Sequence, residues 1–369
     1  MDFFSLQEDA RKKSRFFLLA FGLAVAITVV LMYLAMTLII AVFHGGLPET
    51  LYGYPPSFLA LKPFLMVSAV FIGVTLFASY FKIKAIREGG GLYMAEIMGA
   101  ELMETPRDPR ETQLLNVVEE MSVASGLPRP SLYILRQEMT INAVTGGLDY
   151  EDTVIVVTQG ALTHLDREEL QAVMAHEFAH IINGDFSLNL TMAGWLYGLL
   201  FLSITGEVLM GKTTRIVNMI WGDRAANSNS GDQAGSVLLV FGGLLLWLAG
   251  LALVICGWLS QAAARVVQAA FSRQREFLAD ASAVQFTRNP AGLAGALKKI
   301  ASFPRRGIIR GTNAAMMRAF FIVSPSKADG LMRTHPPLED RILALEPDWD
   351  GTLPRLNLYG GFDWTPPYS

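Results

Sequence analysis

The chain has 369 residues, of which 52% are hydrophobic and only 17% are charged. This composition is too apolar for an ordinary soluble domain and predicts membrane segments. The formal net charge of -3 gives no general basic field, which argues against nucleic acid as a partner. The single cysteine, Cys256, cannot form a disulfide within the chain, and we expect it to be a small packing residue in its apolar run.

The first two apolar runs predict a membrane hairpin. Residues 16–43 follow a basic cluster and form a run longer than the roughly 30 Å hydrocarbon core requires, so this segment would span with tilt. A cleaved signal peptide is the weaker alternative, because the run continues well past a short signal core. The second run, at 64–81, ends in another basic cluster, whereas the connecting loop holds only Lys62. The positive-inside rule therefore predicts that both ends of the hairpin face the cytosol.

The following polar part of the chain predicts a helix and a small sheet. The helix is expected to end where a glycine and a proline follow it. Three short β-like runs come next, separated by polar and glycine turns. The edge of such a sheet could take a substrate backbone as an added strand. The predicted helix covers 109–125, and the runs cover 131–135, 140–145 and 153–158.

The most informative segment is AHEFAHI at 175–181, which matches H-E-x-x-H within a helical pattern. His176 and His180 are one helical turn apart, so both imidazoles would project from one face and could bind a single ion. Glu177 lies one position round the helix, where it could act as general base on a water without ligating the ion. The motif therefore predicts a catalytic metal site.

Local capping signals indicate that the motif lies on a bounded, buried helix. Asp166 is a good N-cap, Glu169 stands three residues later as in a capping box, and Gly184 is the expected C-cap. The alternative is a core helix that happens to carry two histidines. Because the chain has only five histidines, this spacing seldom arises by chance, and the motif in its helical context favours the metal site.

Two more apolar runs follow, at 188–210 and 236–260, and predict a second membrane hairpin. If both runs span, residues on either side of the pair face the same compartment, and a ligand beyond the second run can meet the histidines. The alternative is a hairpin of helices that is buried or lies in the membrane interface, since Asn189, Thr191 and Glu207 make the first run less apolar.

The segment SRQREFLAD at 272–280 offers the missing ligand. Catalytic zinc usually takes three protein ligands, and Glu276 would complete a standard His2Glu set. Asp280, one helical turn further on, could accept the free ring N–H of a ligating histidine. The alternative is a solvated helix face of Arg, Glu and Asp, and spacing alone leaves both interpretations open. Ligand type favours zinc over the harder divalent ions.

Three segments, HEFAHIINGD, SRQREFLADASAVQFTRNPAGLAGALKKI and THPPLEDRI, together resemble the HtpX-type membrane zinc metallopeptidases, relatives of the CAAX prenyl proteases. The similarity extends over about residues 106–347 and includes the paired apolar segments on both sides of the H-E-x-x-H helix. The resemblance implies a gluzincin-type fold in which His176, His180 and Glu276 bind one zinc ion per chain and Glu177 is the base.

The resemblance also implies roles for residues outside the zinc site. The family's edge-strand pattern is matched at 142–146, which implies substrate binding by Asn142 and Ala143, although Val144 replaces the family's aromatic residue. His335, in the T-H-P-P segment, matches a histidine with a catalytic role in binding the substrate carbonyl. The alternative for His335 is a histidine that only shapes a turn before two prolines.

These observations predict an α+β protein that is mainly α, with a gluzincin-like peptidase domain, a small β-sheet and about four transmembrane helices in two hairpins. The predicted parts are an N-terminal membrane hairpin at 1–87, the first peptidase segment with the H-E-x-x-H helix at 88–187, the second membrane hairpin at 188–260, the second peptidase segment with the third ligand at 261–347, and a tail at 348–369.

The resemblance implies an endopeptidase of the bacterial inner membrane with its site facing the cytosol. Its expected partners are the lipid bilayer and misfolded or membrane-associated polypeptides, which it would hydrolyse in protein quality control. Two alternatives remain open, a latent zinc-binding membrane adaptor and a zinc hydrolase of prenylated or other specialised substrates. Glu177 argues against the adaptor, since a site used only for binding needs no base.

Overall fold

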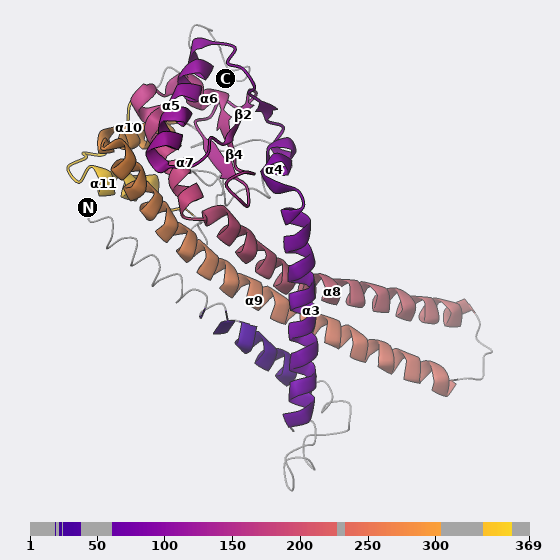
Figure 1. Ribbon diagram of the computed structural model, residues 1–369. Helices are drawn as coiled ribbons and strands as arrows, with labels where there is room; N and C mark the ends of the chain where they lie inside the picture. The colour runs from indigo at the N-terminus through magenta and orange to yellow at the C-terminus, as the bar shows by residue number, and fades with distance from the viewer. Residues whose placement is uncertain are drawn as a thin grey trace, which may run out of the picture. The chain divides into compact units, whose positions relative to one another are not determined.

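The computed structural model describes residues 19, 22–23, 25–37, 61–226, 233–303 and 335–355. It is mainly helical and contains one four-stranded sheet (Figure 1). The chain divides into an α/β unit, formed by the described parts of Ile86–Leu190 and Gln268–Ser369, and a helical unit, formed by those of Phe16–Ala85 and Thr191–Val267. A mainly α protein with a small sheet is therefore confirmed.

The sheet of the α/β unit is mixed, with the strand order β1-β2-β4-β3. The central pair, β2 and β4, is parallel, while β1 and β3 pair antiparallel at the two edges. The strand expected from residue 140 starts only at Ala143, because the Thr158 side chain occupies the preceding backbone: it donates to the carbonyl of Thr140 and accepts from the amide of Asn142. The strands are β1 (Glu101–Leu102), β2 (Ser131–Leu135), β3 (Ala143–Gly146) and β4 (Val154–Thr158).

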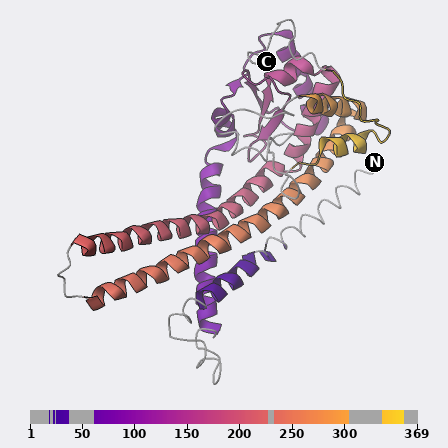
Figure 2. The same ribbon diagram turned by 180° about the vertical axis from the view of Figure 1, so that it is seen from behind.

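Six helices of the α/β unit cover the sheet or extend its core. Figure 1 shows α5, α6 and α7 on one side of the strands and α4 on the other, and Figure 2 shows the same arrangement from behind. Helix α10 packs on α7, and α11 packs on α10. The helix predicted at 109–125 is confirmed as α5. The helices are α4 (Gly90–Met98), α5 (Pro109–Ser125), α6 (Gln159–His164), α7 (Arg167–Ile182), α10 (Pro290–Ser302) and α11 (Leu338–Leu345).

Both faces of the sheet are buried, because alternate residues of a strand point to opposite faces and helices cover each one. The first face joins the large core under α5, α7 and α10, and the second packs on α4. Residues of β2 and β4 on the first face are Leu132, Ile134, Ile155 and Val157, and those on the second are Tyr133, Leu135, Val154 and Val156.

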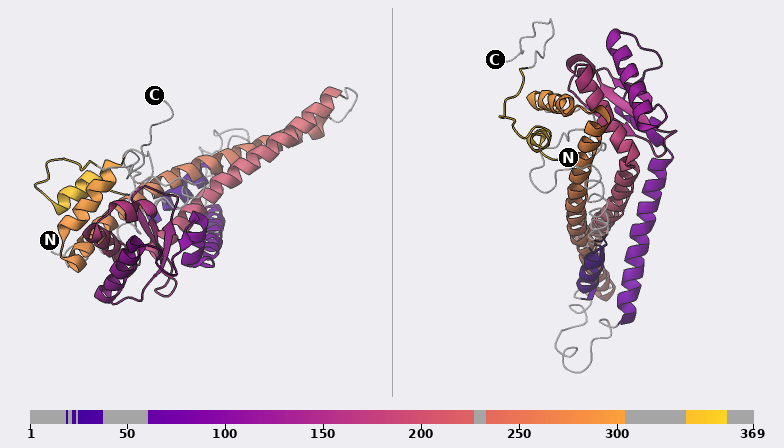
Figure 3. Two further views of the ribbon diagram at one scale, coloured as in Figure 1. Left: turned by 90° about the horizontal axis from the view of Figure 1, so that it is seen from above. Right: turned by 60° about the vertical axis from the view of Figure 1, so that its left-hand side comes forward.

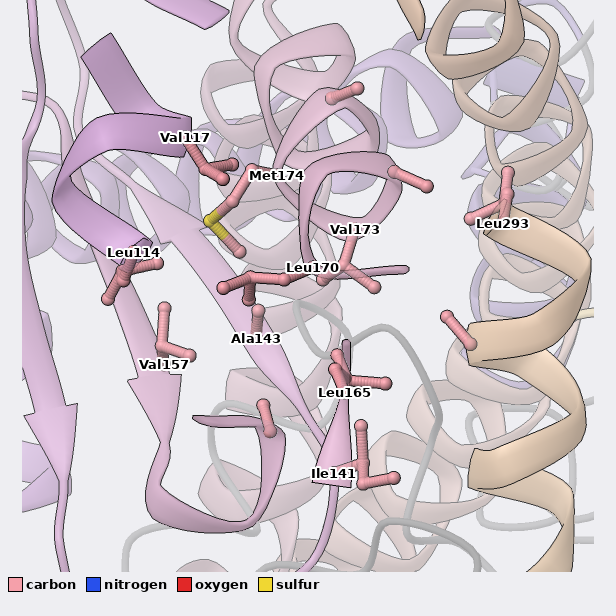
Figure 4. Close-up of a cluster of buried hydrophobic side chains, with 14 of the residues drawn as sticks. Leu114, Val117, Ile141, Ala143, Val157, Leu165, Leu170, Val173, Met174 and Leu293 are labelled. Atoms are coloured by element: carbon pink, nitrogen blue, oxygen red, sulfur yellow. The ribbon is translucent and has the colours of Figure 1, made fainter. Parts of the chain in front are cut away.

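The H-E-x-x-H helix, α7, is fixed inside the large core. Figure 4 shows its residues Leu170, Val173 and Met174 between Val117 of α5 and Leu293 of α10, all within one cluster of buried side chains. Because such close-packed surroundings leave little freedom to a side chain, the helix holds its functional residues in fixed directions.

The ends of α7 are set by the expected local signals, with one difference. Asp166 accepts a hydrogen bond from the amide of Glu169 and the Glu169 side chain accepts one from the amide of Asp166, both at 2.9 Å, so the predicted capping box is present. The C-cap is Asn183 rather than Gly184, which follows it with a φ of 64° that glycine adopts without strain. This turn leads directly into the next helix at Asp185.

The helical unit consists of described membrane-type helices, of which α8 begins in the α/β unit and α9 ends in it. Among the described residues, three helices hold stretches long and apolar enough to cross a membrane, at Phe64–Ala85, Gly194–Ile216 and Gly242–Thr287. Of the run expected at 16–43, the described residues contain a shorter apolar helix, Val25–Thr37, and the rest lies outside them. The three long helices are α3 (Leu61–Arg87), α8 (Asp185–Ala226) and α9 (Gln233–Thr287).

Glycines allow these helices to pack closely in the helical unit. A Cβ atom at Gly206 of α8 would lie 2.5 Å from the carbonyl oxygen of Gly250 on α9, and one at Gly198 would lie 2.5 Å from that of Thr75 on α3. Figure 3 shows α8 and α9 running side by side. Small residues at such contacts are typical of membrane helices. Cys256 is buried in this unit, as expected of a packing residue.

Candidate metal centre

The α/β unit brings together the three residues expected to bind zinc. The Nε2 atoms of His176 and His180 on α7 are 3.1 Å apart. Glu276 on α9 places its two carboxylate oxygens 3.6 Å from Nε2 of His176 and 3.7 Å from Nε2 of His180. One ligand atom from each of the three lies within 4.8 Å of the others, the one such group found among the described residues.

A carboxylate lies beside the far nitrogen of each histidine. Oδ1 of Asp280 is 2.9 Å from Nδ1 of His176, and Oδ2 of Asp185 is 2.7 Å from Nδ1 of His180. A proton held on Nδ1 leaves the Nε2 lone pair free to face the centre. Asp280 was expected to make such a contact. Asp185 was not, although its place just after the turn that ends α7 is a signal that could have found it.

Two arginines complete the surroundings. The guanidinium of Arg341 is fully buried, with Nη1 3.0 Å from Oε2 of Glu276, and it donates hydrogen bonds of 2.8 and 2.6 Å to the two oxygens of Asp280. Arg275 pairs with Asp185 and donates to the carbonyl of Asn183 at 2.7 Å. Neither arginine was predicted to take part.

The segment 272–280 is therefore not a solvated helix face. Glu276 and Asp280 are each only 4% exposed, and the cation that relieves their repulsion is Arg341. A buried carboxylate pair of this kind is stable only when it is neutralised and hydrogen-bonded. The alternative of a solvated helix face is wrong for this segment, because both carboxylates are buried against Arg341. That arginine lies on α11, far along the chain.

The charges of the centre fit a divalent cation. Four carboxylates, on Glu177, Asp185, Glu276 and Asp280, and two guanidinium groups, on Arg275 and Arg341, lie in the described part of this cluster, so these groups alone carry an excess of two negative charges. Burial alone lowers the pKa of His180, but its hydrogen bond to Asp185 and the nearby carboxylates raise it to about 9. In the metal-free protein the His180 imidazole therefore binds a second proton, and its positive charge offsets part of the negative charge of the cluster. The two imidazole nitrogens and one carboxylate oxygen match the donors that zinc prefers.

Glu177 lies next to the three ligands and is held by the sheet. The hydroxyl of Thr145, on the edge strand β3, donates a 2.6 Å hydrogen bond to Oε2 of Glu177, and both side chains are buried. A carboxylate fixed beside a metal site without joining the ligand group is positioned to act as a base. Thr145 was not predicted to have this role, since a threonine within a strand carries no distinctive signal.

The remaining predicted site residues lie in different surroundings. His335 is buried, with Nδ1 3.1 Å from Oε1 of Glu276, and its Nε2 has no hydrogen-bond partner within the described ranges. Asn142 is fully buried just before β3, and its side-chain oxygen accepts from the amide of Ala143 at 3.0 Å. Ala143 pairs with β4 on one side only, so β3 forms an edge of the sheet.

A buried group of two histidines and a glutamate, and three membrane-type helices among the described residues, are the features expected of a membrane metallopeptidase. Comparison with known proteins agrees: residues 108–348 match peptidase family M48, and the chain belongs to this family. The predicted peptide-hydrolase activity is thereby confirmed, and the relatives that follow confirm the predicted HtpX-type resemblance. Zinc dependence is general in the family.

Curated relatives point to the same family. The "Protease HtpX homolog" of Thermoanaerobacter pseudethanolicus is 34% identical over 242 residues, which cover 65% of this chain and 74% of the relative. The protein of the same name from Ligilactobacillus salivarius is 36% identical over 270 residues, covering 70% and 83%. Among solved structures, S. mikatae Ste24p aligns with 93% of this chain and 66% of its own, with a TM-score of 0.38 and 16% identity.

Proposed function

We propose that this chain is a zinc endopeptidase of the bacterial inner membrane that hydrolyses misfolded or membrane-associated polypeptides at the cytosolic face, in protein quality control. The observation that carries the proposal is the convergence of His176, His180 and Glu276 on one point, with Glu177 fixed beside them. The HtpX protease homologues support the same activity.

We assign one zinc ion per chain to His176, His180 and Glu276, in a gluzincin-type arrangement. When bound, zinc would polarise the substrate carbonyl and lower the pKa of a water molecule to about 7. Asp280 and Asp185 keep the two imidazoles in the tautomer and direction that this binding needs.

Proton transfer falls to Glu177. It takes a proton from the attacking water and passes it to the leaving amine, and its hydrogen bond from Thr145 keeps the carboxylate in place during both steps. His335 donates a hydrogen bond to the developing oxyanion. Its position beside Glu276 supports this role, because Glu276 orients the imidazole from one side.

We propose that the substrate backbone adds to the sheet along β3. The strand is an edge, it carries Thr145 of the active site, and Ala143 would offer its carbonyl there, since its amide already donates to Asn142. Asn142 fixes the start of the strand through its bond with the amide of Ala143. Main-chain pairing of this kind suits a peptidase that accepts many sequences.

The membrane arrangement is proposed as four helices in two hairpins, with the peptidase segments at 88–187 and 261–347 on the cytosolic side, the N-terminal hairpin at 1–87, the second at 188–260 and a tail at 348–369. Support comes from the three candidate spans and from the basic residues Lys82, Lys84 and Arg87 at the end of the first hairpin. The apolar stretch Gly242–Thr287 has 46 residues, more than the roughly 20 that a span needs, so its end with Glu276 can extend beyond the bilayer.

The test is cleavage of an unfolded, unmodified protein by the detergent-purified, zinc-loaded chain beside Glu177→Gln at matched zinc content. We expect zinc-dependent cleavage that the substitution nearly abolishes. Glu168→Gln, an exposed carboxylate on the same helix, is the matched control and should retain activity. Zinc bound by all three proteins without cleavage would refute the proposal and favour a latent adaptor or a hydrolase of specialised substrates.

A further inference from the structure

A pocket of about 370 Å³ opens beside the metal centre within the α/β unit. Its walls are the β3–β4 loop, which includes Gly147 and Thr153, and the segment formed by the end of α7, the turn after it and the start of α8 up to Ser187. His180 and Thr145 both line it. The pocket therefore begins at a proposed zinc ligand and at the residue that holds the proposed base.

The lining of the pocket combines apolar surface with a single carboxylate. Leu148, Ile182 and Phe186 supply apolar wall, and most of the polar lining is uncharged. Among the described lining residues Asp149 is the one acidic side chain, and it is exposed. Once His180 is held by a metal as a neutral imidazole, Asp149 is the one formally charged side chain in the described lining.

The loop that carries Asp149 is held in place by its own contacts. The carboxylate of Asp152 accepts hydrogen bonds from the amide of Gly91 on α4, at 3.0 and 3.2 Å, and from the amide of Leu148 at 3.3 Å. The carbonyl of Asp149 accepts from the Thr153 hydroxyl at 2.8 Å. The wall is thus preformed, which lowers the ordering cost of binding.

We propose that this pocket receives a substrate side chain next to the cleaved bond and that Asp149 selects Lys or Arg there. The inference rests on the proposed peptidase function. A basic side chain fits both parts of the lining, because its methylene stem packs on apolar wall while its cationic end pairs with the carboxylate. Leucine would use the apolar wall alone, and glutamate would meet a like charge.

Peptides that differ only in Lys, Leu or Glu next to the cleaved bond test the selection, with the cleaved bond located by mass spectrometry. For the zinc-loaded chain we expect the highest kcat/KM for the Lys peptide. Asp149→Asn should lower the Lys-to-Leu ratio of kcat/KM by about two- to fivefold, because water partly screens the ion pair that an exposed carboxylate makes. Asp149→Lys should shift the preference towards the Glu peptide.

Glu151→Gln is the matched control. Glu151 is an exposed carboxylate two residues further along the same loop and does not line the pocket, so its substitution should leave the Lys-to-Leu ratio unchanged. A ratio that is the same in Asp149→Asn as in Glu151→Gln would overturn the selection by Asp149.

Binding provides a readout independent of turnover. In the Glu177→Gln background, fluorescence anisotropy should show that Asp149→Asn weakens binding of the Lys peptide more than binding of the Leu peptide. Cleavage of all peptides with a ratio insensitive to Asp149 would refute this subsite and leave the peptidase standing. Asp149-dependent binding without any cleavage by the wild-type chain would refute the peptidase and leave the subsite standing.

Discussion

Replacing Arg341 by Met tests whether buried ion pairs hold the metal centre together. Its guanidinium is fully buried, 3.0 Å from Glu276, and makes two hydrogen bonds to Asp280. At an effective dielectric constant near 20, a charge pair at this distance gains roughly 5 kcal/mol of gross attraction, much of which the cost of burying the charges offsets. Removing one partner still costs about 3–5 kcal/mol, because the other charges stay buried and uncompensated.

The metal-free chain shows this loss most directly. With about 2–4 °C per kcal/mol for a domain of roughly 200 residues, the unfolding transition of Arg341→Met should lie roughly 6–20 °C below that of the wild type. Differential scanning fluorimetry of the detergent-purified protein measures the shift. Methionine retains much of the buried arginine stem, so little of the effect comes from a cavity.

Zinc should recover part of the loss, since the ion supplies positive charge beside Glu276. Arg341→Lys is the matched control, because it keeps the charge but loses the two-pronged geometry, and its shift should be smaller. If the transition of metal-free Arg341→Met lay within about 2 °C of the wild type, the reasoning about uncompensated charge would be refuted.

Three further predictions concern the histidines. Asp280→Asn and Asp185→Asn should each weaken zinc binding about 10–100-fold in competition with a fluorescent chelator, and wild-type affinity in either would contradict the role of its carboxylate. Zinc binding near pH 7.5 should release about one proton from His180, because its pKa of about 9 in the metal-free protein lies above the unfolded value near 6.5. Calorimetry in buffers of different ionisation enthalpy measures that proton, and the stability that protonated His180 gives the metal-free chain should be lost as pH rises through about 9. Burial, with the charge of Lys299, lowers the pKa of His164, so the unfolded chain binds the proton more tightly and stability should fall as pH drops below about 6.5. The Tm of His164→Gln should lack that part of the fall, and an identical pH profile would exclude His164 as its source.

Helix α7 could be predicted closely because its signals are local. Asp166 and Glu169 cap it within four residues, and the two histidines follow from its periodicity. Glu276 and Asp280 could be nominated from their spacing, since one helical turn separates them. Their burial could not be predicted from this segment, because a charged stretch of helix looks the same whether it faces water or a distant arginine.

The role of Arg341 could not be predicted from the sequence. This arginine lies 61 residues beyond Asp280, in a short helix where an arginine is ordinarily a surface residue. Its role depends on tertiary packing that no local pattern records. The role of Asp185, in contrast, could have been predicted from a local signal. This residue follows the end of α7 closely, so a search for a carboxylate partner of His180 could have identified it.

The contacts around the two histidines form two rows of side chains. One runs from His176 to Asp280 to Arg341, and the other from His180 to Asp185 to Arg275. Helix α9 contributes to both rows, through Asp280 in the first and Arg275 in the second, and it also carries the proposed ligand Glu276. A rotation of this part of α9 would displace the ligand and break both rows together. A centre with only some of these contacts formed should therefore gain little free energy. We expect the centre to form as one cooperative unit, together with the packing of α9 against α7.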